Sequence, residues 1–149
     1  MFKIALKRTL VGFGLGLALF GASTGAVSAQ DTPAEAANKD LVLGFYQALN
    51  DADAAGKTGE RITDIAQKYL SPDYVQHAEA FANLPGPGSA RDKLVRMFQS
   101  MPPMPAMPPQ KVIAVMAEGD LVMLLTSRDF PDPAGGPAKP RFVFNMFRV

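Results

Sequence analysis

Hydrophobic and polar residues follow two different periods along the chain. Between residues 38 and 70, apolar residues recur every three or four positions, which predicts two amphipathic helices, one ending before Gly56 and one at Ser71-Pro72. A third short helix is predicted after Ser89, which starts a capping box. Residues 32–35 (TPAE) match another capping box, so the first helix can start there, weakly at first and firmly by Asn38. The apolar stripes of the three helices are Leu41, Val42, Phe45, Ala48 and Leu49, then Ile62, Ile65, Ala66, Tyr69 and Leu70, then Leu94, Val95 and Phe98.

The later part of the chain predicts strands. Residues 112–130 read as a hairpin that turns at Gly119, because glycine adopts the positive φ of a tight turn. Residues 141–149 read as a last strand, and residues 74–77 as a short extended piece. The last strand places Phe142, Phe144 and Met146 on one face and Val143, Asn145 and Phe147 on the other.

Helices that precede an antiparallel sheet indicate the α+β class. Both faces of the long strands are apolar, so one face can pack on the helices while the other lines a cavity or meets a partner chain. Residues 100–109 contain five prolines, which exclude a regular helix or a central strand. No internal repeat or second domain is visible.

Residues 1–29 have the pattern of a secretory signal peptide. Lys3, Lys7 and Arg8 precede the apolar run 10–22, and the small residues 27–29 form a cleavage site. A retained membrane anchor is the alternative, which the four glycines at positions 12 to 21 weaken. We therefore expect a periplasmic or secreted protein with no membrane attachment after cleavage.

Composition limits the chemistry that the chain can perform. Without residues 1–29 the chain carries 12 Lys and Arg against 14 Asp and Glu, and no basic stripe, so a nucleic-acid partner is not expected. There is no cysteine, which excludes disulfides, cysteine nucleophiles and lipid attachment after the apolar run. Zinc spacings and phosphate-binding glycine loops are also absent, so no cofactor is predicted.

Three segments carry a family resemblance: 69–77 (YLSPDYVQH), 114–120 (AVMAEGD) and 143–149 (VFNMFRV). In this order and spacing they resemble the SnoaL-like polyketide cyclase branch of the nuclear transport factor 2-like superfamily. The resemblance covers most of residues 38–149, which we interpret as one domain after an N-terminal linker at 30–37. It implies a cone-shaped, curved antiparallel sheet crossed by three helices, a largely apolar pocket, a homodimer built on the sheet and, in catalytic members, a cofactor-free aldol-type cyclisation.

Two departures from the family concern catalysis. The family has a further strand that carries the general acid/base aspartate in a His-Trp-Asp-like motif, whereas this sequence stops at Val149, so we expect a C-terminally truncated domain. Asn145 stands where relatives usually have an aspartate, and an amide cannot titrate. A non-catalytic binding module is therefore favoured over a cyclase or isomerase.

Two residues could still transfer protons. His77 is the only histidine, and its place in the Y-x-Q-H motif matches a pocket-side residue of the family; the alternative is a hydrogen-bonded histidine that shapes the pocket mouth. Asp129 is the other candidate acid/base, against the alternative of a solvated charge at a strand end. If the chain is an enzyme, one of the two abstracts a proton next to a carbonyl and a tyrosine holds the enolate.

The predicted ligand is small, mostly apolar and carbonyl-bearing. The residues expected to contact it are Tyr46, Tyr74, Phe98, Met116, Phe144 and Asn145. Met101, Met104 and Met107 are spaced by three and could line up on a polyproline II helix, which permits either a Cu(I) site or, the preferred interpretation, an apolar lid. Arg91 and Arg148 are expected to be surface or ion-pairing groups.

The last strand also predicts self-association. If residues 141–149 have no neighbour on their outer side, their unpaired backbone groups and phenylalanines need a partner chain to cover them. We therefore expect a homodimer formed through the sheet.

Overall fold

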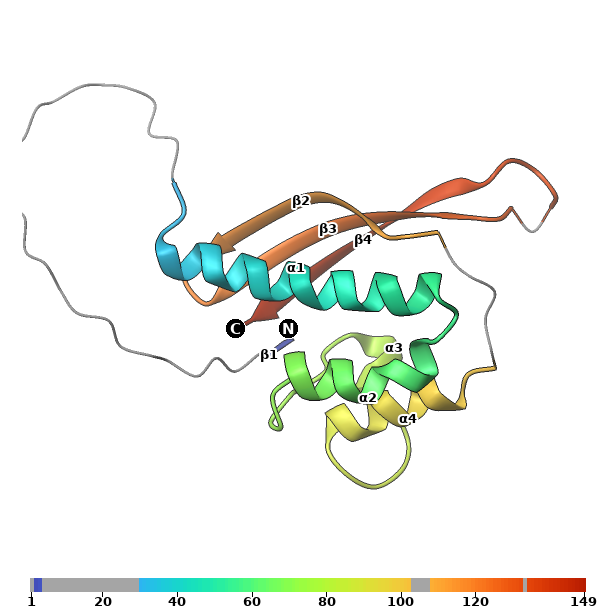
Figure 1. The fold of residues 1–149 in the computed structure, drawn as a ribbon, viewed down its shortest axis with the longest axis horizontal. Coiled ribbons are helices and arrows are strands. Elements are labelled where there is room, and N and C mark those ends of the chain that lie inside the picture. Colours follow the sequence, from blue (N-terminus) through green and yellow to red (C-terminus); the bar gives the residue numbers. More distant parts are fainter. Residues whose placement is uncertain (1, 4–29, 103–107, 133) are drawn as a thin grey trace, which may run out of the picture.

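A computed structural model describes residues 2–3, 30–102, 108–132 and 134–149 (Figure 1). Helices and strands are segregated along the chain, which confirms the α+β class. The helices are α1 (Pro33–Ala54), α2 (Thr58–Tyr69), α3 (Glu79–Ala82) and α4 (Ala90–Ser100), and the strands are β1 (Phe2–Lys3), β2 (Lys111–Glu118), β3 (Leu121–Phe130) and β4 (Lys139–Arg148).

Helix α1 begins with the capping box that the sequence predicts. The Thr32 hydroxyl accepts a hydrogen bond from the Glu35 backbone N–H, and the Glu35 carboxylate accepts one from the Thr32 N–H. Pro33 occupies the first turn, where its missing N–H costs nothing. Residues 33–37, which the sequence analysis assigned to a linker, therefore form the first turns of α1.

The predicted helices after α1 are confirmed, but residues 74–77 form no strand. The Tyr74 N–H instead bonds the Ser71 carbonyl at 3.0 Å in a turn, and the Gln76 side chain accepts a hydrogen bond from the Ala78 N–H. The alternation in this segment is nevertheless real, because Tyr74 and Gln76 are buried while Val75 and His77 are exposed. The short helix α3, which follows, was not predicted.

Strands β2, β3 and β4 form an antiparallel sheet in the order β1-β4-β3-β2. Gly119 makes the β2–β3 turn with φ 59°, as the sequence predicts. The register runs from Leu121 opposite Arg148 to Phe130 opposite Lys139. Strand β1 pairs only its two residues, in parallel, with the C-terminal end of β4.

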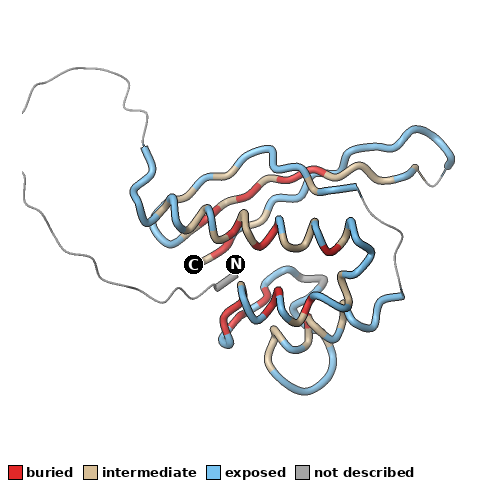
Figure 2. Tube along the Cα trace, in the orientation of Figure 1, coloured by how far each residue is buried: buried red, intermediate tan, exposed pale blue. Residues whose placement is uncertain are grey.

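One face of this sheet packs on the helices, and we call it the inner face. Val122, Leu124 and Thr126 of β3 are fully buried there, and Phe147 of β4 is 1% exposed. Tyr46 of α1 meets Phe147 edge to face, with ring centroids 6.0 Å apart. Figure 2 shows buried residues on the sheet and α1, and also on α2 and the segment that follows it. The core also contains Val42, Phe45, Ala52, Ile65, Ala66, Leu70, Tyr74 and Leu94.

The opposite face, the outer face, is apolar and exposed. Phe142 is 63% exposed, Phe144 59% and Met116 54%. Strand alternation adds Met123, Leu125 and Met146 to this surface. The sheet is open rather than closed, so the cone-shaped barrel that the family resemblance implies stays a prediction.

Among the helices that the structure describes, none combines the length and the apolar character needed to cross a membrane.

Candidate functional site

The inner face is buried at one end and open at the other. Along β4, Phe147 is buried, Asn145 is half-buried, and Val143 is 42% exposed. On the other side of Thr126, Val112 of β2 is 44% exposed. Figure 1 shows that the β3–β4 end of the sheet runs on past the C-terminal end of α1. Thr126, between Val112 and Val143, is nevertheless fully buried, so the exposed positions flank β3 on its two neighbouring strands. We call the set Val112, Phe130, Arg141, Val143 and Asn145 the open inner face.

A partly buried polar cluster joins α1 to this end of the sheet. The Arg128 guanidinium donates to Asp53 Oδ2 at 2.7 Å, and these two side chains are only 12% and 14% exposed. The Thr58 hydroxyl donates to the other Asp53 oxygen. Arg128 Nε is buried and has no hydrogen-bond partner among the described residues. The cluster therefore holds a cation that Asp53 compensates and whose Nε is shielded from solvent.

Asn145 brings a polar group onto the inner face. It lies opposite the buried Leu124 and two residues from Val143, so its amide sits among apolar groups. No hydrogen bond to its side chain is found within the described ranges. A half-buried amide in such surroundings can donate to a carbonyl oxygen.

Tyr46 and Tyr74, two of the predicted ligand contacts, lie in the core instead of on an open surface. Burial raises the pKa of Tyr46 to about 12, and burial together with the neighbouring Tyr46 phenol raises the pKa of Tyr74 above its ordinary range. Both phenols therefore stay protonated at any physiological pH.

The two candidate acid/base residues do not share a site. His77 is exposed and follows Tyr74, which packs into the core on the α1 side of the sheet. Asp129 alternates with the inward-pointing Arg128, so it belongs to the outer face, where it pairs with Lys111 at 3.5 Å. The sheet thus separates the two groups, and they cannot act on one ligand.

The remaining predicted ligand contacts also lie in different places. Met116 and Phe144 are on the outer face, and Phe98 is half-buried on α4. Arg148 forms an ion pair with Asp120 at 2.7 Å, as expected for a surface cation. Of the six predicted contacts, Asn145 alone belongs to the open inner face.

The predicted methionine site falls mostly outside the described residues. Met101 is 41% exposed at the end of α4, whereas Met104 and Met107 belong to the undescribed segment 103–107. Within the described residues, no group of three histidine, cysteine or carboxylate side chains could hold a metal ion.

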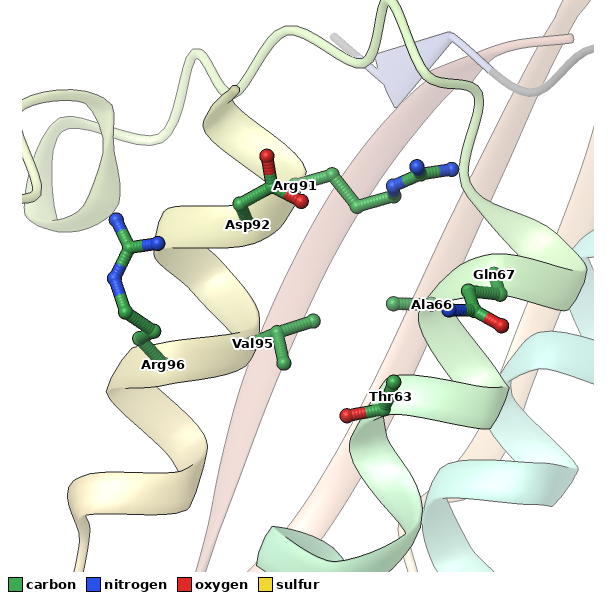
Figure 3. A pocket seen from close by; sticks show the side chains of 7 residues that line it. All are labelled: Thr63, Ala66, Gln67, Arg91, Asp92, Val95 and Arg96. Carbon is green, nitrogen blue, oxygen red and sulfur yellow. The ribbon is translucent and has the colours of Figure 1, made fainter. Parts of the chain in front are cut away.

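A separate groove of about 270 Å³ lies between α2 and α4 (Figure 3). Its charged side chains are engaged by the protein itself: Arg91 donates to the Leu70 carbonyl at 3.1 Å, Arg96 to the Pro87 carbonyl, and Asp92 accepts from Ser89. Figure 3 shows Arg91 reaching across towards α2 while Arg96 points away from it. The groove is also lined by Thr63, Ala66, Gln67 and Val95. These contacts make it a helix-helix junction rather than a prepared site.

The roles of Asp53 and Arg141 in the candidate site were not predicted from the sequence. Alternation along β3 places Arg128 and Asp129 on opposite faces. It could not show which residue meets Arg128, because Asp53 is 75 positions away in the sequence. Only the docking of α1 on the sheet brings the two together.

Searches with the sequence and the structure found no matching family model, no similar curated protein and no similar solved structure.

Proposed function

We propose that this protein is an exported, SnoaL-like domain that binds a small, mostly apolar, carbonyl-bearing ligand on the open inner face and does not catalyse its conversion. The family assignment rests on the three sequence segments at 69–77, 114–120 and 143–149. Export rests on the signal-peptide pattern of residues 1–29.

The observation that carries the binding proposal is the combination of exposed and polar groups on the inner face. Val143 presents apolar surface, and Asn145, two positions along the same face of β4, presents an uncommitted amide. Small-molecule sites usually combine mostly apolar contacts with a few polar groups that orient the ligand. A ketone or ester that lies against Val143 would receive a hydrogen bond from Asn145.

The separation of His77 from Asp129 supports a non-catalytic role. General acid-base catalysis needs its groups within hydrogen-bond reach of the reacting atoms. With Asp129 on the outer face, the described carboxylates near an inner-face ligand are Asp53, which Arg128 neutralises, and Asp132, which Lys139 neutralises. The alternative, a cofactor-free cyclase or isomerase, is favoured only by the two protonated phenols of Tyr46 and Tyr74.

The outer face supports the homodimer that forms the second part of the proposal. Its exposed phenylalanines and methionines form an apolar surface, and such surfaces mark interaction sites. Charged pairs lie at both ends of the surface, Lys111 with Asp129 and Arg148 with Asp120. A second copy placed across a two-fold axis would bury the apolar residues and leave these charges at the rim.

Isothermal titration calorimetry with 2-octanone tests the ligand proposal. We expect saturable binding with a dissociation constant below about 1 mM, weakened several-fold in Asn145→Ala because the carbonyl loses its donor. Gln47→Ala, which removes an exposed amide from α1, is the matched control and should leave the affinity unchanged. Absence of saturable binding, or equal loss in both variants, would refute the proposed site.

A further inference from the structure

We propose that the ligand of the open inner face carries a carboxylate, and that Arg141 binds it with Arg128 beside it. This inference rests on the proposed function and adds to it the chemical class of the ligand's polar head. It follows from the arrangement of cations at the open end of β3 and β4.

Two arginines face each other across this end of the sheet. Arg128 and Arg141 are directly opposite in the β3–β4 register, so their Cβ atoms lie about 5 Å apart on the same face. Like charges in opposed positions destabilise a sheet unless an anion compensates them. Asp53 compensates the charge of Arg128. Arg141 forms no ion pair with a carboxylate among the described residues.

The remaining charges nearby do not compensate Arg141. Lys139 pairs with Asp132 at 2.9 Å, and this pair is neutral as a unit. The inner-face end of the hairpin therefore carries one net positive charge, on a guanidinium that is exposed and reaches solvent. A positively charged group beside apolar surface attracts an amphipathic anion.

The geometry also orients the two guanidinium groups. Arg141 lies over the Phe130 ring with its guanidinium carbon 4.9 Å from the centroid, which limits its freedom. Arg128 is fixed by Asp53, and its buried Nε has no described partner. Guanidinium groups bind carboxylates through paired N–H donors, and their preorganisation reduces the entropy lost on binding.

The apolar part of such a ligand has a defined path. Val143 follows Arg141 by two positions on β4, and Asn145 follows by four, so all three point to the inner face. A carboxylate at Arg141 places the body of the molecule along Val143, and a carbonyl further along reaches Asn145. The inferred ligand is thus a medium-chain oxo-carboxylate.

The test compares octanoate with 2-octanone by calorimetry at pH 7.5, on the protein and two variants. We expect octanoate to bind about fivefold more tightly than the ketone, which is the effect of one partly exposed ion pair. Arg141→Gln should abolish this preference, so that octanoate and 2-octanone bind with equal affinity. Arg61→Gln removes an exposed arginine from α2 and should retain the preference.

Each other outcome overturns the inference in a distinguishable way. Equal affinities for octanoate and 2-octanone would refute the carboxylate and leave the proposed ligand site standing. A preference that survives in Arg141→Gln, or falls equally in Arg61→Gln, would show a non-specific charge effect. If neither compound binds, the proposed function fails and the inference fails with it. Arg141 is exposed, so an unchanged melting temperature will show that Arg141→Gln is folded.

Discussion

The side-chain amide of Asn50 on α1 bonds both backbone groups of Gln110. Its Oδ1 accepts from the Gln110 N–H at 2.9 Å, and its Nδ2 donates to the Gln110 carbonyl at 3.0 Å. At the other end of β2, Glu35 and Asn38 bond the N–H and the carbonyl of Gly119 in the same way, at 2.9 and 3.0 Å. Helix α1 is therefore fastened to both ends of the edge strand β2 by polar contacts.

Replacing Asn50 should separate the helix from the start of β2. Asn50→Ala removes two partly buried hydrogen bonds, and we expect it to lower the free energy of unfolding by about 1 to 2 kcal/mol. Denaturation by urea measures the loss. Gln47→Ala, in which only an exposed contact to Asp51 disappears, should cost less than about 0.5 kcal/mol. Equal losses in Asn50→Ala and Gln47→Ala would show that the Gln110 contact does not contribute to stability.

The ion pair between Arg128 and Asp53 should contribute more to the free energy of unfolding than the contact of Asn50 with Gln110. Asp53→Asn leaves a partly buried guanidinium without its counter-charge, and we expect a loss of about 3 kcal/mol in the same urea experiment. Asp40→Asn, a change of the same type at an exposed position of α1, should be near neutral. A loss below about 1 kcal/mol for Asp53→Asn would contradict the role given to this pair.

Acid should weaken the contact between Glu35 of α1 and Gly119 at the other end of β2. The pKa of Glu35 is lowered from 4.5, first by the Thr32 N–H and then by the Gly119 N–H. A carboxylate with a lowered pKa in the folded state stabilises the protein fully above the unfolded value of about 4.5, and this contribution is lost as the pH falls through the lower folded value.

Glu35→Gln should therefore be less stable than the unmodified protein at pH 7, and the difference should shrink as the pH falls below about 4.5. Melting temperatures measured between pH 3 and pH 7 give this comparison. Glu118→Gln is the control, because it removes the same charge next to the same turn. A pH-independent difference for Glu35→Gln would show that the carboxylate charge is irrelevant there.

The outer face should control the oligomeric state. Phe144 is 59% exposed in the middle of this surface, so Phe144→Glu places a charge in the proposed dimer interface. Light scattering after size-exclusion chromatography should give twice the monomer mass for the unmodified protein and the monomer mass for the variant. Gln67→Glu adds the same charge to α2 and should remain dimeric. A monomeric unmodified protein would end the dimer proposal.

Local signals in the sequence were sufficient to predict the helices, the long strands and many of the buried residues. The Thr32 and Ser89 capping boxes and the Gly119 turn all act within four residues, and the structure contains each of them. The segment around Tyr74 was less predictable: this residue, predicted to contact the ligand, is buried in the core, and the segment makes no strand because no described strand pairs with it. Pairing is a tertiary property that the local pattern does not encode.

The candidate site was less predictable because it depends on which face each strand turns to the helices. Phe142 and Val143 are equally apolar in the sequence, yet one lies on the outer face and the other on the inner face. The contact of Asn50 with Gln110 spans 60 positions and has no sequence signature. Only the docking of α1 assigns the faces, and with them the roles of Asn145 and Asp129.

The two faces of the sheet should have different occupants, and methyl NMR tests this most directly. With 13C-labelled methyl groups, titration of 2-octanone should shift the Val143 signals of the inner face in a saturable way and leave Met116 and Met146 of the outer face unchanged. Shifts confined to Met116 and Met146, or no saturable shift at Val143, would contradict it.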